Sequence, residues 1–257
     1  MVRIEGIKQQ IFVIRELTAR EIKRRYVRSY LGMVWSVLNP LLHMIVMSLI
    51  FSYMFRRSIE NFPLYYLTGS IFWSFFKEAT DHSLTALVDN KTLLLKAKLS
   101  KSTFILSRVY TALVNFGLSC IAYVMILLFF KIKPSWTMIV IIPALFLVLL
   151  FSTGLGYILS ITYVFFADIK YLFGILMTFW MYLSAIFYPV DRLPLFLQKI
   201  IGFNPIYLAI FICREGIMYG RWAGLNVWLK LIIFAVASIT IGHFFFKRKQ
   251  NLVVQKL

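Results

Sequence analysis

The sequence predicts an all-α integral membrane protein with six transmembrane helices, an N-terminal amphipathic interfacial helix, and short re-entrant or interfacial helices between the fifth and sixth spans. Two observations predict this fold class. Hydrophobic residues make up 61% of the 257 residues and charged residues only 15%, with a mean hydropathy of +0.81, which leaves too little polar surface to coat a soluble globule. The apolar residues also form long runs separated by short basic segments, as in helices that cross a bilayer.

The first 33 residues are expected to form a cytosolic helix that lies on the inner leaflet. Mostly apolar residues recur there at three- and four-residue spacing, at Ile11, Ile14, Thr18, Ile22 and Tyr26, with charged residues on the other side. The alternative is a solvated charge run that only sets the orientation in the membrane. The apolar stretch is too short for a cleavable signal peptide, so the N-terminus is expected to be retained.

Six runs are interpreted as membrane spans. They are Val34–Phe55, Phe62–Phe76, Thr103–Phe130, Trp136–Phe166, Tyr171–Val190 and Leu225–Phe246. The second run is short and needs helical continuation through the polar stretch Lys77–Ser83, or a thin bilayer, to cross. Leu193–Ile201 and Pro205–Cys213 are shorter still, so we expect interfacial or re-entrant helices there.

The basic residues predict the orientation of these spans. A formal net charge of +18 would suggest nucleic acid in a soluble protein, but here Lys and Arg cluster between apolar runs, where anionic lipid and the insertion machinery act on them. With the N-terminus inside, 19 of the 28 Lys and Arg residues fall on the cytosolic side, so both termini are expected in the cytosol. Residues 1–257 are expected to form one domain, with 34–246 in the membrane and 247–257 as a cytosolic tail.

No pattern in the sequence predicts a catalytic, nucleotide-binding or metal site. The glycines never form GxxxxGK[ST], so another subunit must bind ATP if ATP drives the protein. Asp81, His82 and Ser83 are consecutive and cannot converge as a catalytic triad. Cys120 and Cys213 have no CxxC or His-rich partner for a metal.

A run of glycines late in the chain imitates a helix-dimerisation motif. Gly216, Gly220 and Gly224 are spaced four residues apart. The run includes Arg221 and Trp222 and is interpreted as a loop rather than an apolar helix, so a packing role is not expected there.

Several strings in fixed order resemble a known family. After Glu21 the chain reads IKRRYVRSYLGMVWSVLNPLLHMIV, followed by LTGSIFWSFF at 67–76, DNKTLLLKAKLSK at 89–101, YVFFADIKYL at 163–172, YLSAIFYPVDRLP at 182–194 and GFNPIYLAIFICREGI at 202–217. Together they resemble the permeases of the ABC-2 polysaccharide exporter family, which includes O-antigen, capsule and teichoic acid transporters. The resemblance covers nearly the whole chain.

The resemblance implies a multi-pass permease subunit in the bacterial inner (cytoplasmic) membrane, and not an enzyme. Two copies would form a homodimer with two ATP-binding cassette subunits, which would carry ATP and Mg, while this chain would bind no cofactor. The substrate would be a polyprenyl-pyrophosphate-linked polysaccharide, with O-antigen as the first candidate and teichoic acid or capsule as the others.

The resemblance also implies a segment that couples this chain to the ATPase, at Asp89–Lys101. The apolar run in this cationic loop would be costly to expose unless it docks into an ATPase groove, although the lipid headgroups could also cover it. The coupling candidates are Asp89, Asn90, Leu93, Leu94 and Lys96.

Two further groups of residues are candidates for substrate contact. Aromatic rings can stack on sugars without trapping them, although such residues also anchor span ends; the channel candidates are Trp35, Trp73, Trp180, Tyr182, Phe187 and Tyr188. A cationic cytosolic entrance would attract the pyrophosphate through charge-assisted hydrogen bonds. Arg24, Arg25 and Arg28 are the candidates, although a role in topology alone could also explain them.

Two other protein classes are alternatives. A secondary transporter would need more spans or internal repeats and an ionisable group at the midplane, and no acidic residue lies deep in any expected span. A polytopic enzyme acting on a polyprenyl-linked glycan would need convergent carboxylates or a catalytic histidine, and the ten acidic residues lie mostly in termini and loops.

Overall fold

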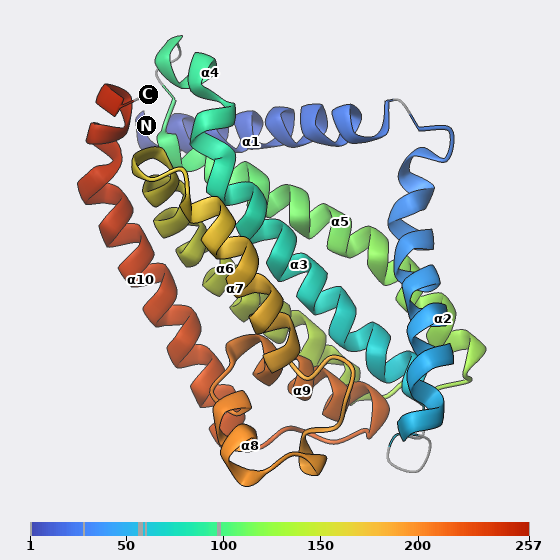
Figure 1. Cartoon of the computed structure of the whole chain (residues 1–257). Coiled ribbons are helices and arrows are strands. Elements are labelled where there is room, and N and C mark those ends of the chain that lie inside the picture. The colour runs from blue at the N-terminus through green and yellow to red at the C-terminus, as the bar shows by residue number, and fades with distance from the viewer. Residues whose placement is uncertain (1, 28, 56–58, 60, 97–98, 257) are drawn as a thin grey trace.

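The computed structural model of the chain describes residues 2–27, 29–55, 59, 61–96 and 99–256. These residues are almost entirely helical and include no strand. Figure 1 shows long helices running between two ends of the molecule. The N-terminal helix α1 (Val2–Tyr26) lies across one end, and the short helices α8 (Leu195–Ile201) and α9 (Pro205–Met218) lie at the other.

The long helices account for most of the chain. They are α2 (Trp35–Phe55), α3 (Phe62–Asp89), α5 (Lys101–Phe129), α6 (Ile141–Phe165), α7 (Ile169–Leu183) and α10 (Leu225–Lys256), with α4 (Lys91–Lys96) between α3 and α5 and 3-10 turns at Gly32–Val34, Trp136–Val140 and Val190–Arg192. Among the described residues, four segments are long and apolar enough to cross a membrane: Gly32–Phe51, Lys101–Phe129, Trp136–Phe165 and Leu225–Val253. Helices α8 and α9 meet at 93° and add a fifth if this bent pair counts as one span.

Helix α3 is the central helix of the bundle. It packs against α2, α5, α6 and α9, and most of its side chains are buried. Pro63 lies in its first turn, where the missing N–H is not needed. The helix continues through the polar stretch Lys77–Ser83 to Asp89, which is the continuation that the second expected span required. The charged residues of that stretch make α3 less apolar than the four segments above.

Two boundaries differ from the sequence prediction. The fifth expected span ends as a helix at Leu183, because the chain turns at Ala185 (φ 48°) and buries Ile186 in the core. Helix α10 continues beyond Phe246, where the sixth expected span ends, as far as Lys256. Val253 of this continuation is buried in a small apolar cluster with residues of α3, α4, α5 and α6, which explains why the helix continues beyond Phe246.

Helices α6 and α10 pack backbone against backbone. A Cβ atom added to Gly242 would overlap the backbone of Gly154, and one added to Gly154 would overlap Ser238. The Ser238 hydroxyl donates a hydrogen bond to the Phe151 carbonyl at 2.8 Å. Small residues therefore let these two helices approach closely, as they do in membrane helix pairs.

Candidate functional site

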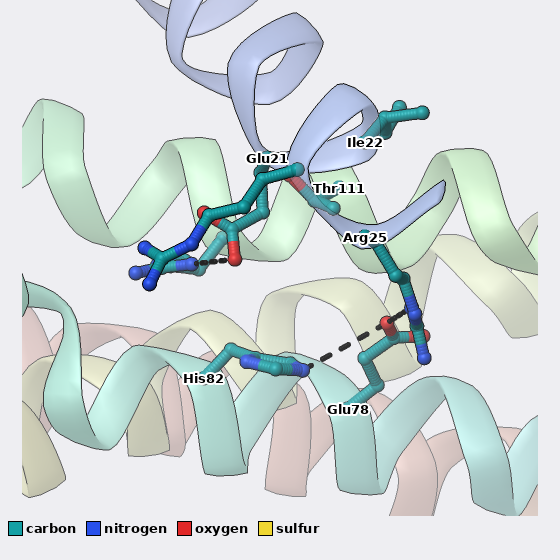
Figure 2. A pocket seen from close by; sticks show the side chains of 8 residues that line it. Glu21, Ile22, Arg25, Glu78, His82 and Thr111 are labelled. Carbon is teal, nitrogen blue, oxygen red and sulfur yellow. Dashed lines mark hydrogen bonds and ion pairs between the residues drawn. The ribbon is translucent and has the colours of Figure 1, made fainter. Parts of the chain in front are cut away.

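A polar cleft lies beneath α1, where this helix crosses the end of the bundle. A pocket of about 270 Å³ is lined by Glu21, Ile22, Arg24, Arg25, Glu78, His82, Arg108 and Thr111, from α1, α3 and α5 (Figure 2). A wider cleft of about 690 Å³ shares Arg25, Glu78 and His82 and extends to the start of α2. Two of the three predicted headgroup arginines, Arg24 and Arg25, therefore line one site. Arg28 lies outside the described residues.

Arg25 and Glu78 join α1 to α3 across this cleft. The Arg25 guanidinium forms an ion pair with the Glu78 carboxylate, and Figure 2 shows the two side chains pointing toward each other from facing helices. The Arg25 side chain is 50% exposed and that of Glu78 only 17%. Glu78 is held between helices because α3 continues past its apolar run, which ends at Phe76.

The Glu78 carboxylate is held in place from a third helix. The Asn115 side chain on α5 donates a hydrogen bond to Glu78 Oε1 at 2.6 Å, and His82 Nε2 lies 3.9 Å from the same oxygen. Asn115 is 7% exposed, and its Oδ1 is buried without a hydrogen-bond partner while the residue lines the wider cleft. A buried acceptor without a partner is costly, so it is a place where a ligand could donate a hydrogen bond.

Arg108 forms a second polar link between the same helices. This buried α5 arginine forms an ion pair with Glu21 of α1 at 2.6 Å and with Asp89 at the end of α3 at 3.0 Å. Arg20 of α1 also donates to the Asn90 side chain at 2.7 Å. Of the predicted coupling residues, Asn90 is thus joined to α1 directly and Asp89 through Arg108.

The rest of the predicted coupling segment forms α4. Leu94 is buried in the small apolar cluster, whereas Leu93 and Leu95 are 37% and 49% exposed. Lys96 is exposed. The short helix α4 therefore anchors itself through one leucine and presents two others on its surface.

The predicted channel aromatics are divided between the two ends of the bundle. Trp35 is exposed and lines the wider cleft, while Tyr182 at the end of α7 is exposed and lies 6.2 Å, centroid to centroid, from buried Phe187. The Tyr188 hydroxyl donates to the Tyr182 carbonyl. Trp73 and Trp180 instead pack within this chain against Phe76.

A buried arginine organises the other end of the bundle. Arg214 of α9 donates hydrogen bonds to the carbonyl oxygens of Tyr65, Ala185 and Ile186 at 2.9–3.3 Å. Its guanidinium lies 3.3 Å from the centroid of the Tyr65 ring. The Asn204 side chain caps α9 by accepting from the Ile206 N–H and from the Trp180 indole.

Sequence reasoning missed four of these polar residues: Glu78, Arg108, Asn115 and Arg214. Glu78 falls in the polar stretch after the second expected span, Arg108 lies in the first turns of the third, and Arg214 directly follows the expected short helix Pro205–Cys213. A charged residue within or next to an apolar run is a signal for Arg108 and Arg214, whereas the partners of Glu78 and Asn115 appear only when the helices are packed together. In the part of the chain that the structure describes, no group of three or more His, Cys, Asp or Glu residues could hold a metal ion.

Comparison with known proteins gives a consistent result. A family model described as ABC-2 type transporter matches residues 13–218. The O-antigen export system permease protein RfbA of Myxococcus xanthus is 31% identical over 203 residues, which cover 76% of this chain and 78% of that protein. The polysialic acid transport protein KpsM of Escherichia coli is 23% identical over 97% and 98% of the two chains. The capsule polysaccharide export inner-membrane protein CtrC of Neisseria meningitidis serogroup A is 26% identical over 83% and 82%.

Proposed function

This chain belongs to the ABC-2 type transporter family, and from that membership we propose that it is the permease subunit of an ATP-driven exporter that moves a lipid-linked cell-surface polysaccharide across the bacterial inner membrane. The observation that carries the proposal is the similarity, over three quarters or more of both chains, to permeases named for O-antigen and capsule export. The chain is a transport subunit rather than an enzyme. ATP and Mg would bind the partner ATP-binding subunit, and this chain would bind no cofactor.

The proposed substrate is a polysaccharide linked to a polyprenyl pyrophosphate. O-antigen is the first candidate because of the 31% identity to RfbA, and capsule or teichoic acid are the other candidates. The pocket that contains Arg24 and Arg25 supports a pyrophosphate headgroup at the α1 end, because guanidinium groups bind phosphates through paired, charge-assisted hydrogen bonds.

We propose six spans, formed by α2, α3, α5, α6, α7 and α10, with both termini in the cytosol. Helix α3 has 28 residues, enough to cross a bilayer, and is shielded from lipid by its neighbours. Helix α1 would lie on the inner leaflet, and the bent pair α8 and α9 would enter the membrane from the outer side without crossing it.

The transporter would contain two copies of this chain and two ATP-binding subunits. Exposed Leu93 and Leu95 on α4 would dock into an ATPase groove. Asp89 forms an ion pair with Arg108, which pairs with Glu21 of α1, and Arg20 of α1 donates a hydrogen bond to Asn90. A movement of α4 would therefore be transmitted to α1. ATP binding shifts the permease between two states only through differential contacts of this kind.

The polysaccharide would pass along aromatic side chains. Trp35, Tyr182 and Tyr188 keep accessible surface in a single copy of the chain and are the favoured contacts. Trp73 and Phe187 are buried, and Trp180 packs against Phe76 and Phe151. These three would reach the path only if the helices separate during transport.

Deletion of the gene for this chain tests the proposed function. We expect the surface polysaccharide to disappear while the lipid-linked glycan accumulates inside the cell. Immunoblots of intact and permeabilised cells measure both pools, and complementation with the intact chain should restore the surface signal. An unchanged surface polysaccharide would contradict export.

The same experiment separates export from enzymatic synthesis. Loss of the glycan from both pools, or a shortened glycan inside the cell, would indicate a polytopic enzyme instead. Restoration of export by this chain without its ATP-binding partner would indicate a secondary transporter.

A further inference from the structure

The ion pair between Arg25 and Glu78 is not expected in a site that binds an anionic headgroup. A site for an anionic headgroup should present free cations, yet here the structure places a carboxylate against one of its two described headgroup arginines. Glu78 reaches Arg25 from a different helix. Its position therefore depends on the fold rather than on the local sequence.

We propose that Glu78 is a built-in competitor of the headgroup, occupying the position of a substrate phosphate when the transporter is empty. A singly charged phospholipid would then be excluded, and only a headgroup with more charge, such as a pyrophosphate, would displace the carboxylate from Arg25. This inference rests on the proposed function and adds a selectivity-determining residue to it.

The two partners differ in mobility as this exchange requires. Glu78 lies on the central helix, is largely buried, and is held by Asn115 through a 2.6 Å hydrogen bond. The Arg25 side chain is half exposed and lies at the C-terminal end of α1. The guanidinium can therefore leave the carboxylate and turn to a ligand in the cleft, while Glu78 keeps its bond to Asn115.

Arg24, next to Arg25, favours the binding of a pyrophosphate over that of a single phosphate. Arg24 lines the same pocket, and no carboxylate in the described part of the chain lies within ion-pair distance of it. Arg108, by contrast, is already paired with Glu21 and Asp89. A pyrophosphate can bind both Arg24 and Arg25, whereas Glu78 pairs only with Arg25, so the doubly charged group displaces the carboxylate more readily than one phosphodiester does.

The excluded lipids are abundant where the cleft opens. Anionic phospholipids in the cytoplasmic leaflet are attracted to basic segments, and two unpaired arginines would be occupied by them most of the time. The unpartnered, buried Oδ1 of Asn115 in the wider cleft offers an acceptor to a hydroxyl next to the phosphates. Sugar hydroxyls adjoin the pyrophosphate of a glycolipid and would meet that acceptor.

The test compares two lipids on the purified full-length chain in detergent, by native mass spectrometry. Farnesyl pyrophosphate is the pyrophosphate probe and phosphatidylglycerol the singly charged competitor. In E78Q, which keeps the shape and the hydrogen bond from Asn115, we expect phosphatidylglycerol binding to rise about three- to tenfold and the preference for farnesyl pyrophosphate to fall by a similar factor. The matched control is E215Q on α9, which removes a carboxylate that pairs with Arg221, is 20% exposed and lies outside both clefts, and it should leave the preference unchanged.

An unchanged preference in E78Q, or an equal change in E78Q and E215Q, would overturn the proposal. The R25Q substitution should weaken farnesyl pyrophosphate binding in both the native and the E78Q backgrounds, and its failure to do so in E78Q would also overturn the proposal. If E78Q does not fold, E78D withdraws the carboxylate from Arg25 and should shift the preference in the same direction. These results are independent of the polysaccharide phenotype, so either conclusion can fail alone.

Discussion

Arg214 shows how one buried side chain can hold three segments together. Its guanidinium binds backbone carbonyls of α3 and of the turn after α7, and it lies over the Tyr65 ring. No carboxylate within the described residues forms an ion pair with it. An uncompensated buried charge is very costly, so the carbonyl dipoles and the ring must supply the compensation.

Replacement of Arg214 should therefore destabilise the protein more than the loss of an exposed arginine does. R214M removes the hydrogen bonds that Arg214 donates to the carbonyls of Tyr65, Ala185 and Ile186, and we expect a loss of about 2–4 kcal/mol of stability. R214K should be nearly as harmful, because an ammonium group lacks the planar fork that serves these carbonyls and the ring. Thermal melting of the purified protein in detergent measures both. The control is R221M, at a side chain that is 69% exposed. If R214K melted at the native temperature, the planar guanidinium would not be required.

The candidate site was predictable only in part from single residues. Arg24 and Arg25 could be selected because a basic approach to an apolar span is visible in the sequence, and the structure brings both to one pocket. Glu78 and Asn115 could not, because their roles depend on α1 crossing over α3 and α5. Sequence spacing reports neighbours on one helix, whereas this site is built from three.

At the scale of elements, two glycines control the packing of α6 against α10. Gly154 and Gly242 lie where the two backbones touch. Among the spaced glycines at 216, 220 and 224, Gly220 follows α9 with φ 62°, but Gly216 lies within α9, and a Cβ there would overlap Val140 and the Thr137 carbonyl. The expectation of a loop with no packing role is therefore wrong at Gly216. The better signal was a glycine in the middle of each of two apolar helices, which only the pairing of these helices makes meaningful.

An alanine at this crossing should separate the helices. G242A places a methyl group against the Gly154 backbone, which cannot move aside, and we expect a loss of about 1–3 kcal/mol, as in overpacked cores. The matched control is G117A on α5, where no atom lies within 4 Å of the added Cβ; there the better helix propensity of alanine should leave stability equal or higher by up to about 1 kcal/mol. Thermal melting of both variants measures the difference. Equal melting temperatures for G242A and G117A would show that α6 and α10 can separate without a loss of stability.

The existence of most helices was predictable from apolar runs, whereas their ends were not. Helix α3 runs past its apolar run because its later half still buries side chains, such as Ala86 and Leu87, against α5 and α6. Helix α7 stops early because the next residues satisfy Arg214 and fill the core. Both differences arise from contacts between distant segments, so hydropathy along the chain could not reveal them.

At the scale of the whole molecule, the charge distribution agrees with the arrangement of the two ends. Figure 1 shows the N- and C-terminal ends of the described chain at the same end of the bundle, together with α4. The segments that the sequence predicts to be cytosolic hold 19 of its 28 Lys and Arg residues. Because basic residues are retained on the cytosolic side during insertion, this end should face the cytosol and the α8 and α9 end should face outward.

Labelling with a membrane-impermeant maleimide tests this orientation, because the two ends carry exposed residues suitable for single cysteines. K8C on α1 and K249C on α10 should react only after the inner membrane of spheroplasts is opened, whereas W222C, at a side chain that is 63% exposed between α9 and α10, should react in intact spheroplasts. The native chain is the control, since Cys213 is buried and Cys120 is half-buried. Labelling of K8C in intact spheroplasts would contradict this orientation. It would also contradict substrate entry at the arginine pocket, because a headgroup made in the cytosol could not reach Arg24 and Arg25 from the opposite face.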